Sequence, residues 1–303
     1  MRVVHETVED LPELPARGTL RAGFAALRPH QWTKNLLLFA GIIFAAKLGE
    51  VDRWIEAWSA FVAYCAASSA AYLLNDVRDI ESDRAHPIKR QRPIASGEIS
   101  TRAALWFAAA LETFALVVAA LLGLRSLGLL VAFGAIQVAY TLRLKHVVLV
   151  DVLAIACLFV IRAAAGAVAV DVRISPWLLL CTWMLSLFLG LGKRRGELVL
   201  VATRDTPGRR VLDGYSLTVV DQLLTIVASG TIVAYALYTF SARDSHALMV
   251  TVPFVVYGVF RYILLLHRGD AGEEPENVLV HDLPILVTVA VWGVTCAAVL
   301  AAT

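Results

Sequence analysis

The densest group of residues that could do chemistry follows the second long apolar run of the sequence. A tyrosine, an asparagine and three aspartates recur there at a spacing that puts them on one face of a helix with about 100° per residue. They are Tyr72, Asn75, Asp76, Asp79 and Asp83. Three carboxylates on one face repel each other unless a cation lies among them, and oxygen donors alone suit a hard ion such as Mg²⁺. The spacing therefore predicts a magnesium and phosphate site, and a solvated loop of mixed charge is the simpler alternative.

A basic segment follows the acidic one directly. Lys89, Arg90 and Arg92 come shortly after the last aspartate, where they could bind the phosphate oxygens that a metal ion bridges. An acidic and a basic segment in this order are typical of a site for a phosphorylated substrate.

The elements that position these residues are apolar helices. Of the 303 residues 59% are hydrophobic and 17% charged, and the mean hydropathy is +0.71, which excludes an ordinary water-soluble domain. A bilayer core of about 30 Å needs roughly 20 apolar residues in a helix. We expect an all-α polytopic membrane protein with nine transmembrane helices, at 35–50, 54–74, 103–122, 126–142, 147–170, 176–192, 217–240, 246–266 and 283–302.

The basic residues predict how these spans are oriented. With the N-terminus inside, 21 of the 27 Lys and Arg residues fall on the cytosolic side, five fall outside and one lies within a span. We therefore expect a cytosolic tail at 1–33, a nine-helix domain at 34–303 and an outward C-terminus. The long polar loops are then cytosolic, which predicts a multi-pass protein of the plasma (inner) membrane whose active site faces the cytoplasm.

Two linked patterns carry a resemblance to a known family. Asn-Asp-x-x-Asp-x-x-x-Asp at 75–83 is followed by His-Pro-x-Lys-Arg-x-Arg-Pro-Ile-x-x-Gly at 86–97. This combination resembles the UbiA superfamily of intramembrane prenyltransferases. The resemblance implies a helical bundle around a central cavity, capped by cytosolic loops, in which Mg²⁺ holds a diphosphate. The metal ligands would then be Asn75, Asp79 and Asp83.

The second motif of this superfamily follows the fourth span and is only partly present. Tyr140 and Lys145 match its Tyr-x-x-x-x-Lys part, but Asp151 stands without a second aspartate four residues later. One carboxylate in place of a pair puts in doubt a second metal bound as in aromatic prenyltransferases.

Arg162 lies deep in an apolar span, where a charge is costly unless it faces a cavity or a partner. It shares a helix face with Asp151, about 16 Å along the axis, since eleven residues amount to nearly whole turns. A substrate phosphate reaching into the bundle could bind it. A buried pair with Glu112 of the third span is the alternative, and the two are compatible.

Two further basic motifs resemble one subgroup of the superfamily, the decaprenyl-phosphate phosphoribosyltransferases. They are Arg-Pro-x-Gln-Trp-x-Lys-Asn at 28–35, which contains Lys34, and Gly-Lys-Arg-Arg-Gly-Glu at 192–197, which contains Lys193 and Arg194. The subgroup implies that these cations bind a phosphorylated sugar. Ordinary membrane-flanking basic residues, Lys34 reaching the interface included, are the alternative.

The resemblance implies an enzyme that transfers 5-phosphoribose from 5-phosphoribosyl 1-diphosphate to decaprenyl or another polyprenyl phosphate. Such a step leads toward the lipid-linked arabinose donor for cell-wall arabinan. An ordinary prenyl transfer to an aromatic or lipid acceptor is the alternative, and a transporter is disfavoured because the polar residues gather at the cytosolic ends. We expect no nucleic-acid partner, and homo-oligomerisation stays open.

The expected site has two parts. The residues with catalytic roles are Asp79, Lys89, Tyr140 and Lys145. The substrate-binding residues are Lys34, Tyr72, Asn75, Asp79, Lys89, Arg90, Lys145, Asp151, Arg162, Lys193 and Arg194.

Overall fold

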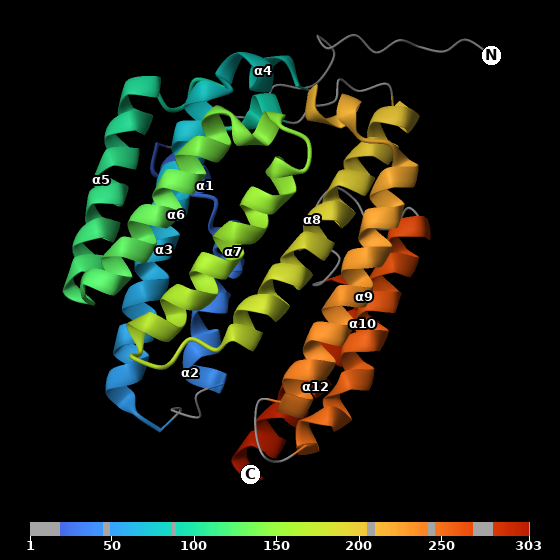
Figure 1. The fold of residues 1–303 in the computed structure, drawn as a ribbon. Coiled ribbons are helices and arrows are strands. Elements are labelled where there is room, and N and C mark those ends of the chain that lie inside the picture. The colour runs from blue at the N-terminus through green and yellow to red at the C-terminus, as the bar shows by residue number, and fades with distance from the viewer. Residues whose placement is uncertain are drawn as a thin grey trace. The chain divides into compact units, whose positions relative to one another are not determined.

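The computed structural model describes residues 19–44, 49–86, 89–204, 210–241, 246–268 and 281–302. Within these ranges the chain is almost entirely helical and has no strand, which confirms the all-α fold class (Figure 1). Two compact units make up the chain. The first consists of 1–36 and 58–134, and the second of 37–57 and 135–303.

Seven helices of the described residues are long and apolar enough to cross a bilayer. They are α3 (Val51–Arg78), α5 (Thr101–Leu121), α6 (Leu124–Leu142), α7 (Val150–Ala169), α8 (Pro176–Arg204), α9 (Leu217–Ser241) and α10 (Val252–Arg268), the last preceded by the 3₁₀ helix η6 (His246–Thr251). The final helix, α12 (Leu283–Ala302), contributes a shorter apolar stretch over Leu283–Val299. The expected count of nine spans is therefore not confirmed.

The structure differs from the membrane span that we expected at 35–50. The chain there forms a 3₁₀ helix, η2 (Pro29–Phe39), and then the short helix α2 (Ala40–Phe44). A 3₁₀ helix has three residues per turn and seldom exceeds four residues, so eleven residues in this conformation need support from tertiary contacts. The apolar composition predicted a membrane segment here but not this tighter winding.

The first unit carries the acidic motif on the end of α3. This helix continues to Arg78 instead of stopping at residue 74, so Asn75 and Asp76 belong to it. The rest of the motif forms α4 (Ile80–Ala85), and the basic segment contains the 3₁₀ turn η3 (Lys89–Gln91). A small apolar core that includes Leu73 and Ile94 fixes this segment against α3.

The second unit is a bundle in which α7 packs against α8, and α8 against α9 (Figure 1). Its core is built around Phe188 and Tyr262, whose ring centroids are 5.2 Å apart. The helix α8 runs twelve residues beyond the predicted end at 192, to Arg204. Lys193 and Arg194 are therefore helical, and their side chains are fixed by the geometry of α8.

A close crossing in the second unit depends on one glycine. At Gly166 of α7 a Cβ atom would lie only 2.0 Å from the carbonyl oxygen of Leu38. Any side chain there would force the two segments apart, since atoms at that distance overlap. Gly166 therefore allows the end of η2 to lie directly against α7.

Candidate active site

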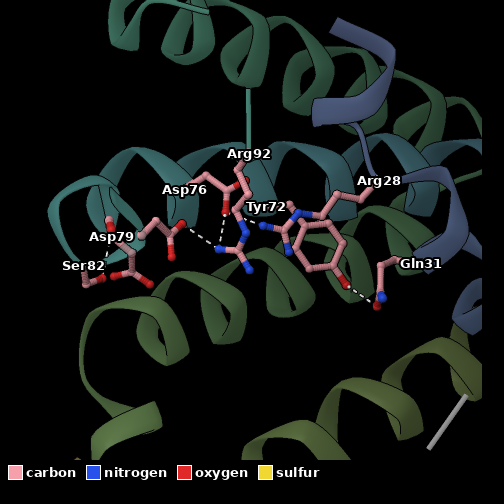
Figure 2. Close-up of polar contacts among 8 residues, drawn as sticks. Arg28, Gln31, Tyr72, Asp76, Asp79, Ser82 and Arg92 are labelled. Carbon is pink, nitrogen blue, oxygen red and sulfur yellow. Dashed lines mark hydrogen bonds and ion pairs between the residues drawn. The ribbon is translucent and has the colours of Figure 1, made fainter. Parts of the chain in front are cut away.

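The acidic motif is held together by two arginines. Asp76, 3% exposed, forms an ion pair with Arg28, and the Nη1 atom of Arg92 lies 3.3 Å from its Oδ1. The same Arg92 nitrogen lies 2.6 Å from Oδ2 of the buried Asp83. Figure 2 shows Arg92 directed at Asp76 from one side and Arg28 from the other. Two of the three crowded carboxylates are thus neutralised by protein cations.

The third carboxylate, Asp79, lies at the junction of α3 and α4. Its N–H donates to the Asn75 carbonyl at 2.9 Å, and its own carbonyl accepts from the N–H of Asp83 at 2.8 Å. The helical hydrogen-bond pattern therefore passes almost unbroken through the motif. As a result Asn75 and Asp79, both half-buried, stay on the side of the helix that the sequence spacing predicts.

The basic residues Lys89 and Arg90 are placed by the turn that returns from α4. The N–H of Arg90 donates to the His86 carbonyl at 3.1 Å, and Arg84 Nε donates to the Ala95 carbonyl at 3.0 Å. The side chains of Lys89 and Arg90 are half-buried. They follow the acidic motif in the same unit, as the prediction of a phosphate site requires.

Lys34 belongs to the same unit through η2. Its ammonium group donates to Oε1 of Gln31, which also accepts from the hydroxyl of Tyr72 at 3.4 Å. The guanidinium of Arg28 lies 5.1 Å from the centroid of the Tyr72 ring. Two residues predicted to bind substrate, Lys34 and Tyr72, are therefore joined through one amide.

In the second unit Asp151 lies at the centre of a buried polar network. It is fully buried, and its Oδ2 lies 2.7 Å from Nε of Arg194, which is 1% exposed. Arg194 also pairs with Glu197, three residues later on α8. Its charge is thus shared by two carboxylates, which favours a supporting role for Asp151 and Arg194 over direct contact with substrate.

A tyrosine from the following connection completes this network. Tyr215 donates a hydrogen bond to Oδ1 of Asp151 at 2.7 Å and accepts one from the N–H of Leu149, also at 2.7 Å. Burial raises the pKa of the Tyr215 phenol, and the bond to Asp151 raises it further, so the hydroxyl stays protonated. Leu149 has a φ of +67°, a strained conformation for leucine. Tyr215 therefore holds the turn from which α7 begins.

The remaining predicted residues of this unit are spread over several elements. Lys145 is 9% exposed and lies in η4 (Leu144–His146), directly after α6, the helix that carries Tyr140. Arg162, 4% exposed, donates to the Leu158 carbonyl at 3.2 Å. Lys193 is half-buried on α8. The predicted site residues of this unit are therefore four cations, the phenol of Tyr140 and the single carboxylate of Asp151.

Comparison with known proteins decides the family. The model of the UbiA prenyltransferase family matches residues 36–283. The chain belongs to the UbiA prenyltransferase family.

Among its UbiA relatives, a decaprenyl-phosphate phosphoribosyltransferase of Mycolicibacterium smegmatis is 34% identical and covers 96% of this chain and 96% of its own. The enzyme of the same name from Mycobacterium tuberculosis is also 34% identical, over 97% of this chain and 99% of its own. A UbiA homolog from Archaeoglobus fulgidus, solved with GPP and Mg²⁺ bound, has a TM-score of 0.70 at 18% identity. It covers 92% of this chain and 99% of its own. That likeness shows the shared UbiA fold.

The UbiA fold raises the question of whether these residues suit Mg²⁺. Among the described residues no three His, Cys, Asp or Glu side chains converge as a ready-made metal cage. Mg²⁺, however, keeps several waters and needs only one or two carboxylates beside substrate phosphates. Asp79 and Asn75 offer hard oxygen donors, and Asp83 lies on the same side with Arg92. The donor set therefore fits the ion.

The structure places Asn75, Asp79, Asp83 and Lys89 in one unit, and their roles as metal and phosphate ligands stay predictions. Several supporting residues were not predicted from the sequence. Sequence reasoning did not assign Arg28 or Gln31, although both stand in the motif around Lys34. It gave Arg92 to the phosphates, whereas Arg92 pairs with Asp76 and Asp83. Tyr215 left no signal, because it stands in a connection far from Asp151 in sequence.

Proposed function

We propose that this protein transfers 5-phosphoribose from 5-phosphoribosyl 1-diphosphate to decaprenyl or a related polyprenyl phosphate and releases diphosphate. The observation that carries this proposal is the 34% identity, over nearly the whole of both chains, to relatives named decaprenyl-phosphate phosphoribosyltransferase. The predicted site residues of the second unit support it, because three phosphate-bearing groups must be held and four of these residues are the cations Lys145, Arg162, Lys193 and Arg194. The product would serve the synthesis of cell-wall arabinan.

In this proposal the acidic motif of the first unit binds the donor. Asn75, Asp79 and Asp83 would hold Mg²⁺, which when bound neutralises charge on the departing diphosphate. Lys89 and Arg90 donate charge-assisted hydrogen bonds to the diphosphate oxygens. Asp76 keeps its two arginines and serves as the anchor of the motif.

The reaction is a direct displacement at the anomeric carbon of the ribose. An oxygen of the lipid phosphate forms a bond to C1 while the bond from C1 to the diphosphate oxygen breaks, and its electron pair leaves with the diphosphate. The lipid phosphate is already anionic near neutral pH, so no residue has to act as a general base. Tyr140 and Lys145 orient the acceptor phosphate or the ribose 5-phosphate, and they stabilise charge as the transition state forms.

Cations of the second unit bind the remaining phosphate groups. Arg162 and Lys193 bind anionic oxygens, while Asp151 and Arg194 keep the Lys145 turn and α8 in register. The protein acts within the plasma membrane with its site open to the cytoplasm, which agrees with the cytosolic excess of basic residues.

A comparison of substrate pairs tests this function. Purified protein with Mg²⁺ is incubated with labelled 5-phosphoribosyl 1-diphosphate and decaprenyl phosphate, or with geranyl diphosphate and an aromatic acceptor. We expect label in the lipid fraction only from the first pair. Prenyl transfer without phosphoribosyl transfer would replace the proposal by the alternative UbiA reaction.

A further inference from the structure

The polar residues at the start of η2 fall into two rows. In a 3₁₀ helix residues three apart lie one above the other, because each turn contains three residues. One row contains Gln31 and Lys34 and begins next to Arg28, whose carbonyl accepts from the N–H of Gln31 at 2.9 Å; the other contains Trp32 and Asn35. In an α-helix each step of three residues would turn by about 60° relative to the one before, and the rows would fan out.

The second row docks η2 along α3. The indole nitrogen of Trp32 donates to the hydroxyl of Ser69 at 3.0 Å, and the amide of Asn35 lies 3.3 Å from the sulfur of Cys65. Ser69 in turn donates to the carbonyl of Leu27 at 2.9 Å. Cys65 and Ser69 are one turn apart on α3, so these bonds fix both the position and the rotation of η2.

The first row leads from the acidic motif toward Lys34. Arg28 pairs with Asp76, and Gln31 accepts from both Tyr72 and Lys34 (Figure 2 shows the contact between Gln31 and Tyr72). Arg28 has a φ of +54°, which is strained for arginine and turns the chain from α1 (Thr19–Ala26) into η2. The strained backbone at Arg28 and the long 3₁₀ helix η2 thus lie in the same segment as Gln31 and Lys34.

The chemistry of Gln31 suits a residue that aims a cation. An amide oxygen accepts hydrogen bonds from an ammonium group and a phenol at once, and it carries no charge. It therefore fixes the direction of Lys34 without cancelling the positive charge that a phosphate needs. A glutamate here would hold Lys34 equally well but would neutralise it and repel an anion.

We propose that Gln31 is a positioning residue, which holds Lys34 and Tyr72 toward a phosphate group of a substrate. This inference rests on the proposed function, in which Lys34 and Tyr72 bind substrate. The shared chemistry is a phosphate monoester or diphosphate, and either the sugar donor or the lipid acceptor could supply it. The 3₁₀ winding of η2 is what places Gln31 one turn before Lys34.

The experiment compares Gln31→Met and Gln31→Glu with Trp32→Phe. All three variants change one side chain of η2, but Trp32→Phe removes the docking bond to Ser69 and leaves the bonds of Gln31 to Lys34 and Tyr72 in place. Each purified protein is assayed for KM toward 5-phosphoribosyl 1-diphosphate and toward decaprenyl phosphate. Thermal stabilisation by 5-phosphoribosyl 1-diphosphate alone is measured as a second readout that needs no turnover.

We expect Gln31→Met to raise one of the two KM values by about 2- to 10-fold, the range that one lost hydrogen bond gives. Gln31→Glu should raise the same KM by roughly tenfold or more while the protein stays as stable as the wild type. Trp32→Phe should lower stability and leave both KM values near those of the wild type, because an aromatic ring remains and Asn35 still docks η2 at Cys65. The KM that moves identifies the substrate whose phosphate Lys34 binds.

A double variant tests whether Gln31 acts through Lys34. In a Lys34→Met background, Gln31→Met should add little to the rise in KM, because the cation that it aims is gone and only its 3.4 Å bond to Tyr72 remains to be lost. Fully additive effects, or a Gln31→Glu protein with wild-type KM values, would overturn the inference. A wild-type protein that neither transfers phosphoribose nor is stabilised by the donor would instead refute the proposed function.

Discussion

Arg92 pairs with two buried carboxylates, Asp76 and Asp83, so its removal should lower the stability of the protein by a predictable amount. Arg92→Met leaves Asp83, whose side chain is 5% exposed, without the cation 2.6 Å away, whereas Asp76 keeps Arg28. Removing one partner of a buried ion pair costs about 3–5 kcal/mol. Because the Arg92 side chain is itself 27% exposed, water can enter its place and solvate Asp83, which lowers the cost. We expect a decrease of about 2–4 kcal/mol in the free energy of unfolding.

The assay is thermal or denaturant unfolding of the purified protein in detergent, followed for single and double variants. Asp83→Asn should restore most of the stability that Arg92→Met removes, because the uncompensated buried charge disappears. It should not restore turnover, since Asp83 is a proposed metal ligand. An Arg92→Met protein as stable as the wild type, or no stability gained from Asp83→Asn, would refute the reasoning.

Three other predictions concern the remaining parts of the site. Tyr215→Phe removes the bonds to Leu149 and Asp151 and should lower the free energy of unfolding by about 2–4 kcal/mol, measured against wild type by thermal unfolding. Asp79→Ala should abolish turnover with unchanged unfolding, as EDTA should for the wild type; activity of this variant in EDTA would exclude the metal role. Arg162→Met should weaken substrate use about 10- to 100-fold in steady-state assays, and recovery of activity on adding Glu112→Gln would remove Arg162 from the site.

Several helix positions and the clustering of the acidic residues were predictable from the sequence. Apolar length alone placed the helices that became α5, α6, α7 and α9 to within a few residues, because a membrane span is a matter of length and composition. The spacing of Asp76 and Asp83 predicted a shared face, and both do bind Arg92. Helical periodicity survives the junction at Asp79, since the backbone hydrogen bonds continue through it.

The parts that failed depend on tertiary contacts. No local pattern distinguishes eleven residues of 3₁₀ helix from an α-helix, and this segment is held by tertiary contacts such as the bonds of Trp32 and Asn35 to α3. The role of Tyr215 depends on a turn at Leu149, whose φ is positive. A leucine in the sequence does not predict such a turn. Arg92 was assigned to the substrate phosphates because it is a cation. In the structure it pairs with Asp76 and Asp83, because the basic segment folds back against the acidic motif.

In the proposed function, this chain joins a phosphorylated sugar to a polyprenyl phosphate at a magnesium-dependent site built on Asp79. The most direct measurement is mass spectrometry of the lipid product, with diphosphate quantified in the same reaction, for wild type and Asp79→Ala. We predict one decaprenyl phosphate carrying 5-phosphoribose for each diphosphate released by the wild type, and neither product from Asp79→Ala. Diphosphate release without a phosphoribosylated lipid, or an unmodified decaprenyl phosphate after full donor consumption, would contradict the account.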